Sequence, residues 1–337
     1  MTPTNPLGRR ALVTGVAGQD GGYMAEQLLA EGRRVWGLIR PGGLARAAEL
    51  PWLRGVELIE GDLADRASLA RAFAAADPEE IYNLASFSQP SLAWSDPEAS
   101  ANVNALGPLR LLELVREAGP GRVRFVQAST SEIFGPSAPN PQDERTPLCP
   151  ATPYGSAKAY AHQLVAHYRE RFGLFAGAAI LYNHESPRRG REFVTRKITR
   201  AAARIKLGLE RQLVLGDLDA RRDWGYAPDY VRAMRLMLGA DAPDDYVIGT
   251  GETHSVGEFL QLAFARVGLR PEEFVRVDPS LGGHSNPVGL AADAARARDR
   301  LGWRPTVGFE QLVGLMVEAD LAREGEIVPS PAGRGLG

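Results

Sequence analysis

Cysteine is almost missing from this chain, since Cys149 is the only one among 337 residues. No disulfide can form within the chain, and such sparing use of cysteine fits a reducing cytoplasm. Cys149 lies between prolines with no activating partner in the sequence around it, so we interpret it as a loop thiol. The five histidines show no metal-ligand spacing, and no metal site is expected.

An excess of charge of one sign and long apolar runs are also missing. The formal net charge is −2 and the sequence pI is about 6.3, which gives no electrostatic case for binding nucleic acid or an anionic membrane. No apolar run approaches the ~20 residues of a membrane span, and the N-terminus lacks a signal-peptide pattern. We therefore expect a cytoplasmic protein, and its hydrophobic content of 44% is enough for a substantial core.

The first half of the chain alternates short apolar runs with helical stretches. Strands are expected at 11–13, 35–39, 56–59, 80–84, 123–127 and 175–181. Helices are expected at about 22–31, 66–76, 98–118 and 154–172. This βαβ alternation predicts an α/β fold with a Rossmann-like, doubly wound parallel sheet.

After about residue 185 the pattern changes to helical segments separated by glycine- and proline-containing loops. These segments lie near 193–207, 228–238, 256–267 and 309–322. We expect residues 1–185 to form the cofactor-binding Rossmann domain with the catalytic residues. Residues 186–328 would form a smaller, mainly helical substrate-binding lobe, interleaved with the end of the sheet, and residues 329–337 a frayed tail.

A glycine-rich turn follows the first expected strand and opens a helix. The glycines are spaced G-x-x-G-x-x-G, which permits a tight turn and lets the backbone approach a pyrophosphate at the helix N-terminus. This strand–turn–helix context predicts a dinucleotide site. The loop residues that would line it are Gly15, Gly18, Gln19, Asp20 and Gly21.

The ends of the next strands offer further cofactor contacts. Arg40 ends the second strand, where an arginine suits a 2′-phosphate, so NADP is favoured over NAD, unless Arg40 is only a solvated strand-end residue. Asp62 and Leu63 follow the third strand and can touch the adenine edge. The fourth strand ends in small residues against which the cofactor can lie, namely Leu84, Ala85 and Ser86.

A set of proton-transferring groups lies at the fifth strand and on the helix after it. Thr130 ends the strand within the run Ser129–Glu132, at the sheet edge where ligands of open α/β folds bind. Tyr154 and Lys158 are four residues apart, so they share one helical face. We expect Tyr154 to be a general base once Lys158 lowers its pKa, with Thr130 sharing the proton of a substrate hydroxyl.

Glu132 adds a carboxylate that a plain oxidoreductase of this kind does not need. It lies two residues beyond Thr130, so it should face the same cleft and can take a proton from carbon. An elimination requires such a base, and a solvated loop carboxylate is the alternative. Glu132 therefore favours a dehydration coupled to hydride transfer.

From about residue 10 to 323 the chain resembles the GDP-mannose 4,6-dehydratases, within the extended short-chain dehydrogenase/reductase superfamily. The specific segments are residues 14–21, 127–132 (QASTSE), 183–190 (NHESPRRG), 193–198 (FVTRKI) and 218–225 (LDARRDWG). The resemblance implies that NADP is held by the glycine loop together with Asp62, Leu63, Leu84, Ala85, Ser86, Ser88, Lys158, His184 and Arg189. It implies catalysis by Thr130, Glu132 and Tyr154 with Lys158, and substrate binding by Ser88, Ser131, Asn183, Val194, Lys197 and Arg222.

The implied reaction is a closed redox cycle on GDP-mannose. Hydride passes from C4 of the sugar to NADP while Tyr154 takes the hydroxyl proton. Glu132 then removes the acidified C5 proton, water leaves from C6, and the hydride returns to C6. The product is GDP-4-keto-6-deoxymannose, and the resemblance implies a homodimer or homotetramer.

Some positions depart from the family pattern. Beside the cofactor, this chain has Phe87–Gln89 and Ala99 where the family usually has other residues. The family's late Arg-Pro-x-Glu-Val-Asp motif, which touches the nucleotide, is replaced by a different sequence within 283–289. Another sugar nucleotide, such as a GDP-heptose or a CDP- or UDP-hexose, is therefore an alternative substrate. A 4-epimerase, a 4-keto reductase and a non-catalytic NADP-binding protein are further alternatives.

Overall fold

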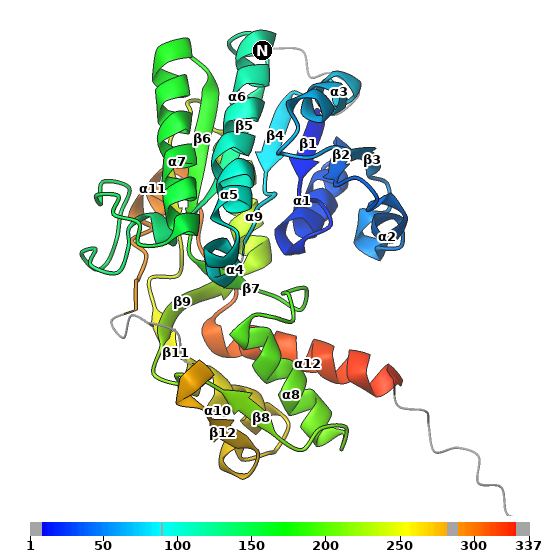
Figure 1. The fold of residues 1–337 in the computed structure, drawn as a ribbon, viewed down its shortest axis with the longest axis vertical. Helices are drawn as coiled ribbons and strands as arrows, with labels where there is room; N and C mark the ends of the chain where they lie inside the picture. Colours follow the sequence, from blue (N-terminus) through cyan, green and yellow to red (C-terminus); the bar gives the residue numbers. More distant parts are fainter. Residues whose placement is uncertain (1–8, 89, 282–288, 328–337) are drawn as a thin grey trace, which may run out of the picture.

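The computed structural model describes residues 9–88, 90–281 and 289–327. Its larger part is a sheet of seven parallel strands in the order β10-β6-β5-β4-β1-β2-β3 (Figure 1). The order reverses between β1 and β4, where ligands of doubly wound sheets bind. The strands are β1 (Arg10–Thr14), β2 (Arg34–Ile39), β3 (Glu57–Glu60), β4 (Glu80–Asn83), β5 (Arg124–Thr130), β6 (Phe175–Leu181) and β10 (Tyr246–Ile248).

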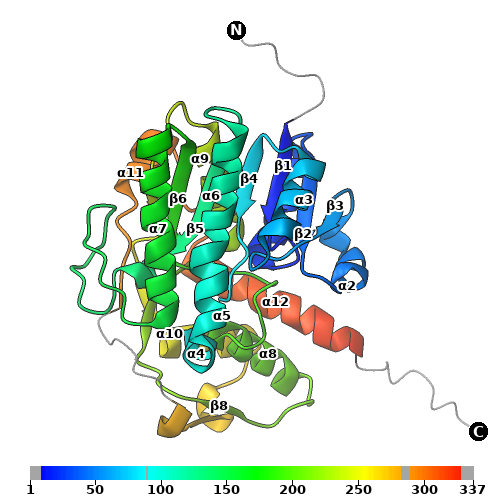
Figure 2. The ribbon, with the colours of Figure 1, turned by 45° about the horizontal axis from the view of Figure 1, so that its top comes forward.

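Helices cover both faces of this sheet (Figure 2). One face carries α1 (Gln19–Ala30), α9 (Ala227–Gly239) and α11 (Ala295–Leu301), and the other carries α3 (Arg66–Ala76), α6 (Gly107–Ala118) and α7 (Pro153–Phe172). Because both faces are buried, a central strand such as β6 is one apolar run, FAGAAIL, rather than an alternation. The edge strand β3 (ELIE) is partly exposed. The predicted α/β fold with a Rossmann-like parallel sheet is confirmed.

Several short elements were not predicted, because three to six residues carry no readable period and these have no long apolar run. They include α2 (Leu44–Ala48), α4 (Pro90–Ser95), η1 (Pro51–Leu53), η3 (Ser131–Ile133), η4 (Pro271–Glu273), η5 (Pro279–Leu281) and the edge strand β10. The single helix expected at 98–118 is α5 (Pro97–Ala101) followed by a π-helical segment, η2 (Asn102–Leu106), and then α6.

The smaller lobe is built from α8 (Val194–Lys206), α10 (Val256–Arg266) and α12 (Phe309–Ile327). Their apolar faces share a core that includes Ile198, Phe259 and Met316. Strands β8 (Leu213–Leu215) and β12 (Val275–Val277) pair beside these helices. The lobe also contains the buried ion pair Arg196–Asp320, with a nitrogen–oxygen distance of 2.6 Å, between α8 and α12.

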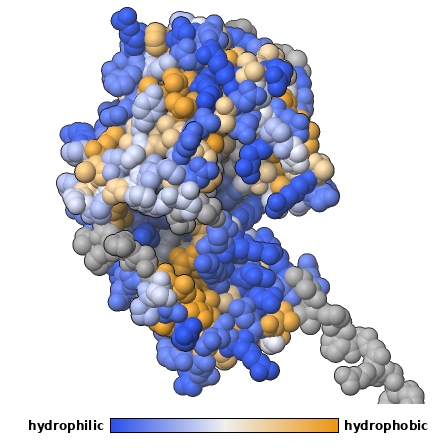
Figure 3. Space-filling view, in the orientation of Figure 1, coloured by the Kyte–Doolittle hydropathy of each residue, from blue (hydrophilic) through white to orange (hydrophobic). Residues whose placement is uncertain are grey.

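A three-stranded sheet of β7 (Asn183–Glu185), β9 (Arg221–Tyr226) and β11 (Thr253–Ser255) lies where the two parts meet. The molecular surface is hollowed at this junction (Figure 3). Among the described residues, no helix is long and apolar enough to cross a membrane, and no group of acidic, histidine or cysteine side chains could hold a metal ion.

Candidate active site

The end of β5 places Thr130 and Glu132 at the carboxyl edge of the main sheet. Thr130 keeps an extended backbone and caps the short helix η3, its Oγ1 accepting a hydrogen bond from the Glu132 amide at 3.3 Å. The chain therefore turns sharply after the strand instead of continuing past the sheet. The hydroxyl and the carboxylate consequently lie on the same turn.

Helix α7 brings Tyr154 and Lys158 to this edge. The helix starts just before Tyr154 because Thr152 caps it, accepting from the Gly155 amide at 2.9 Å, and Pro153 occupies its first turn. Both side chains are buried. The Lys158 ammonium donates to the carbonyl of Ala128 at 3.1 Å and lies 5.8 Å from the centre of the Tyr154 ring. One acceptor leaves the ammonium with donors to spare.

Burial sets the pKa of both members of this pair. It raises the pKa of Tyr154 to about 12, an effect that Glu132 reinforces and that hydrogen bonds from Ser86 and Thr130 oppose. Burial also lowers the pKa of Lys158 to about 8. The groups that lower the pKa of Tyr154 here are Ser86, Thr130 and Arg189, and burial outweighs them. The expectation that Lys158 lowers this pKa stays a prediction.

Glu132 and Arg222 act on each other across the junction. Burial raises the pKa of the Glu132 carboxyl, and the positive charge of Arg222 on β9 partly offsets this. The Glu132 side chain is nevertheless accessible to solvent, so it is desolvated by the walls of a concave site rather than by a packed core. A carboxylate of raised pKa that a substrate can reach is suited to general-base catalysis.

The glycine loop forms a cradle at the N-terminus of α1, and its turn is so tight that side chains would clash with neighbouring backbone. Gly15 has φ of +67°, and a Cβ there would lie 2.8 Å from the Ala85 backbone; at Gly21 it would lie 2.2 Å from the carbonyl oxygen of Gly15. Gly18 begins α1 without any side-chain cap. The first-turn amides and the positive end of the helix dipole are thus presented to a ligand, which fits the pyrophosphate of a dinucleotide.

Side chains beside the cradle contact each other. His184 on β7 bonds to Asp20 at 2.8 Å, and Gln19 donates to the His184 carbonyl and accepts from Ser186. Arg189 pairs with the buried Glu185 at 3.1 Å. The predicted cofactor residues of the glycine loop and of the segment 183–190 are therefore brought together, although they are 165 positions apart in the chain.

The remaining predicted cofactor residues lie along the same edge. Arg40 is exposed after β2. Leu63 packs against Gly107, and the carboxylate of Asp62 accepts from the Ala64 amide. The amides of Leu84 and Ala85 are held by the Thr14 hydroxyl at 3.1 and 3.0 Å.

The predicted substrate residues are spread over the junction and the lobe. Ser88 is exposed after β4, and Ser131 lies in η3. Asn183 lies in β7, Val194 starts α8, and Lys197 is exposed one turn further along α8. Of the positions that depart from the family pattern, Gln89 and residues 283–288 lie outside the described part of the chain.

Two buried polar residues that shape the site were not predicted. Asn104 in the π-helical segment accepts from the Ser86 hydroxyl and the Phe87 amide, which fixes the loop after β4. Asp223 accepts from Thr250 and Gly251 and so ties β9 to the loop after β10. Strand alternation in RRDWG, which places Asp223 and Arg222 on opposite faces, was the available signal.

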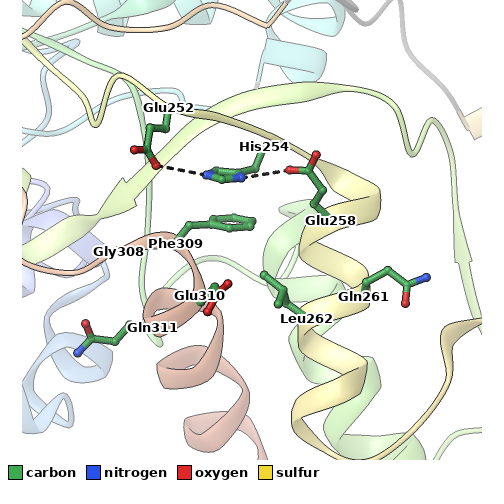
Figure 4. Close-up of a pocket in the computed structure, with 9 residues that line it drawn as sticks. All are labelled: Glu252, His254, Glu258, Gln261, Leu262, Gly308, Phe309, Glu310 and Gln311. Carbon is green, nitrogen blue, oxygen red and sulfur yellow. Dashed lines mark hydrogen bonds and ion pairs between the residues drawn. The ribbon is translucent and has the colours of Figure 1, made fainter.

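A second hollow, of about 820 Å³, lies on the lobe between β11, α10 and the start of α12 (Figure 4). His254 stacks on Phe309 there, with ring centres 3.7 Å apart, and lies between Glu252 and Glu258. None of the predicted site residues lines it. Although this hollow is large, we do not assign it as the catalytic centre, because it contains none of those residues.

Comparison with known proteins gives consistent matches along the chain. A family model described as GDP-mannose 4,6 dehydratase matches residues 12–316. GDP-mannose 4,6 dehydratase 1 of Arabidopsis thaliana is 47% identical, with 92% of this chain and 89% of that protein covered. The GDP-mannose 4,6 dehydratase of Homo sapiens is 42% identical, with 92% and 91% covered.

Solved structures share the fold over the same length. A UDP-glucose 4-epimerase from Thermus thermophilus, in complex with NAD, superposes with a TM-score of 0.80 at 29% identity, covering 92% of this chain and 98% of that one. A UDP-glucose 4-epimerase from Thermotoga maritima, with UDP-glucose, gives a TM-score of 0.81 at 26% identity, covering 94% and 99%.

Proposed function

The chain belongs to the GDP-mannose 4,6-dehydratase family, and we propose how its own residues carry out the hydro-lyase reaction of that family. The reaction converts GDP-mannose to GDP-4-keto-6-deoxymannose and water. The main observation behind these proposed roles is that Glu132 lies in one cleft with Tyr154 and Thr130.

The cofactor is of the NAD(P) class, and we assign NADP to it. When bound, such a cofactor would supply the acceptor for the hydride from C4 of the sugar and the donor of that hydride to C6. The cradle around Gly15 and Gly21 fits its pyrophosphate, and the spare donors of Lys158 suit ribose hydroxyls. Arg40, exposed at the end of β2, suits a 2′-phosphate.

The oxidation step needs a base for the proton of the C4 hydroxyl. Tyr154 takes this proton, and Thr130 shares a hydrogen bond with the same oxygen. Hydrogen bonds from Ser86 and Thr130 and the nearby charge of Arg189 stabilise the phenolate, against the burial that raises the pKa of Tyr154. In this scheme Lys158 positions the ribose and adds positive charge.

The elimination step is assigned to Glu132. The C4 ketone acidifies the C5 proton, which the Glu132 carboxylate removes. The resulting carboxylic acid gives this proton to the C6 hydroxyl, which leaves as water. The proton that Tyr154 took from the C4 hydroxyl balances the one later delivered to C5. A raised pKa makes the carboxylate a stronger base. Neither epimerisation nor 4-keto reduction requires this group.

The nucleotide end of the substrate is assigned to the junction and the lobe. Arg222 and Lys197 carry the charge that a diphosphate requires. Four further residues complete the proposed substrate site: Ser88, Ser131, Asn183 and Val194. We propose that residues 186–328 mainly serve this part of the substrate and that residues 1–185 serve the cofactor.

A direct assay tests the proposal. The protein is incubated with GDP-mannose and NADP, and 4-ketone formation is followed together with reduced cofactor. We expect ketone to accumulate without a matching build-up of NADPH, because the hydride returns to C6. Steady accumulation of NADPH, or turnover of a CDP- or UDP-hexose in preference to GDP-mannose, would contradict it.

We also propose that the protein is a homodimer or homotetramer. Large apolar side chains are exposed on the face formed by α4, η2 and α7, namely Trp94, Leu106, Tyr160 and Phe172. Covering them would remove apolar surface from water. Light scattering on the purified protein measures the mass, and a monomer would contradict this.

A further inference from the structure

Both ring nitrogens of His184 face groups that only accept hydrogen bonds. Nδ1 lies 2.7 Å from the carbonyl oxygen of Tyr182, so Nδ1 must carry a proton. Nε2 lies 2.8 Å from a carboxylate oxygen of Asp20. An ionised carboxylate also only accepts, so a proton must lie between Nε2 and Asp20. The geometry therefore describes an imidazolium paired with a carboxylate, with no net charge.

The pair is fixed from several sides. The His184 ring stacks on Tyr230 of α9, with ring centres 4.6 Å apart and planes 26° from parallel. The other carboxylate oxygen of Asp20 accepts from Gln19 at 3.1 Å, and Gln19 also donates to the backbone of His184. Neither member can turn away from the other without breaking a second contact.

The pair lies where the charge of the Asp20 carboxylate affects anion binding. Asp20 lies in the first turn of α1, two residues after Gly18, beside the cradle assigned to the pyrophosphate. A carboxylate at a helix N-terminus stabilises the helix but repels an anion that binds there. The imidazolium of His184 cancels this repulsion, because the two charges are only one hydrogen bond apart.

We propose that Asp20 is a positioning residue that holds His184 as an oriented imidazolium, so that one shared proton keeps the anion site neutral and controls dinucleotide affinity. This rests on the proposed role of the glycine loop in binding the dinucleotide. It assigns to Asp20 a contact with His184 in place of one with the cofactor. Loss of the shared proton would leave the bare Asp20 carboxylate facing the pyrophosphate.

Other charged groups around the pair fit this scheme. Burial opposes the charged form of His184, but the Asp20 carboxylate outweighs it and the pKa of His184 is raised. Burial likewise opposes ionised Asp20, yet His184 and Arg189 bring its pKa down. Burial raises the pKa of Tyr230 well above its ordinary value, so its phenol stays neutral. Lys158 on α7 also feels Asp20 and has a pKa of about 8.

The test compares four full-length proteins: the wild type, Asp20→Asn, His184→Gln and the double variant. The dissociation constant for NADP is measured by calorimetry from about pH 6 to about pH 10, across the range in which a raised histidine pKa falls. Lys158 titrates in all four proteins, but the charge of Asp20 raises its pKa, so its contribution matches only between proteins with the same residue at position 20. The wild type is therefore compared with His184→Gln, and Asp20→Asn with the double variant. The difference within each comparison reports the pair.

The expected pattern is specific. His184→Gln leaves Asp20 uncompensated and should bind about tenfold more weakly throughout. Asp20→Asn and the double variant should bind tightly, with only the slope that Lys158 gives. The wild type should follow Asp20→Asn at low pH and approach His184→Gln at high pH. A wild type that runs parallel to His184→Gln at all pH values would overturn the proposal.

A second readout does not involve the cofactor. The His184 signal in nuclear magnetic resonance spectra is identified by its loss in His184→Gln. The pH titration of this signal gives the proton affinity of His184, which should be at least tenfold lower in Asp20→Asn than in the wild type. Asp20→Glu, which keeps the carboxylate, should restore part of this affinity. An unchanged titration overturns the pair. A normal titration shift without any NADP binding by the wild type would instead overturn the proposed function on which this inference rests.

Discussion

The carboxyl edge of the main sheet and the lobe that faces it are held by different kinds of interaction. At the sheet edge, backbone elements and short caps position the reactive groups, as Thr130 and Thr152 do at η3 and α7. In the lobe, buried ion pairs join helices far apart in sequence, and Arg196 and Asp320 are 124 positions apart. Local geometry holds the side chains at the sheet edge, whereas long-range charge pairing holds the helices of the lobe together.

This contrast explains why one region could be read from sequence and the other only in part. A strand end followed by a helix with Tyr154 and Lys158 is determined within thirty or so residues. The lobe depends on which partner each charged side chain finds. Arg196 also donates to the carbonyls of Pro187 and Arg189, so an ion pair with α12 supports the loop beside the cofactor cradle.

The largest expected effect tests the sheet edge. Glu132→Gln should lower turnover to the 4-ketone sugar by ~10²- to 10⁴-fold, because an amide cannot take the C5 proton. Oxidation at C4 does not need Glu132, so reduced cofactor should now accumulate after GDP-mannose is added. Ketone product and nicotinamide absorbance are measured in parallel.

Tyr154→Phe is the matched control for this prediction. It removes the base for the C4 hydroxyl and should abolish both ketone formation and the appearance of reduced cofactor. If Glu132→Gln retained most of its turnover, the reaction would be one without elimination, such as an epimerisation.

The next effect tests the lobe. Asp320→Asn leaves the buried Arg196 without its counter-charge and should lower the free energy of unfolding by about 3–5 kcal/mol. Urea unfolding measures the change. Glu117→Gln is the control, since its ion pair with Arg66 is about half exposed on both sides and is worth at most about 1 kcal/mol. If both variants lost the same unfolding free energy, the buried ion pair of the lobe would be no more important than an exposed pair on the larger part.

A third effect joins the two regions. Glu132 must be ionised to act, so activity should fall as the pH drops through its pKa, which is raised above the ordinary 4.5. Arg222→Gln removes the cation that offsets this rise, so the acid limb of the kcat profile should move to higher pH. The KM for GDP-mannose should rise about tenfold or more from the lost diphosphate contact.

Lys197→Gln is the matched control for Arg222→Gln. Lys197 is exposed on α8 and is not among the charges that act on Glu132. Its loss should raise KM but leave the acid limb in place. A shift of the acid limb in both variants would mean that Glu132 responds to the overall charge of the lobe rather than to Arg222.

The sequence predicted most of the fold and part of the site, for physical reasons that differ by residue. Long elements such as α7 have a readable period and a capping residue, so their limits were nearly right. Strand β10 has three residues and owes its place to pairing with β6, which no local pattern reveals. The upward effect of burial on the pKa of Tyr154 was not foreseen, because burial depends on the tertiary structure.

The smallest expected effect concerns Arg40. This residue lies at the sheet edge, but no cap or backbone contact fixes its side chain in the described residues. It is exposed, and no described residue forms an ion pair with its guanidinium. Arg40→Ala should therefore weaken NADP binding by about tenfold and leave NAD binding nearly unchanged, because only NADP carries the 2′-phosphate. Calorimetry with both dinucleotides measures this preference. Equal weakening of both would show that Arg40 supports the loop after β2 rather than the phosphate, and the choice between the two cofactors would then depend on backbone geometry, like the rest of this edge.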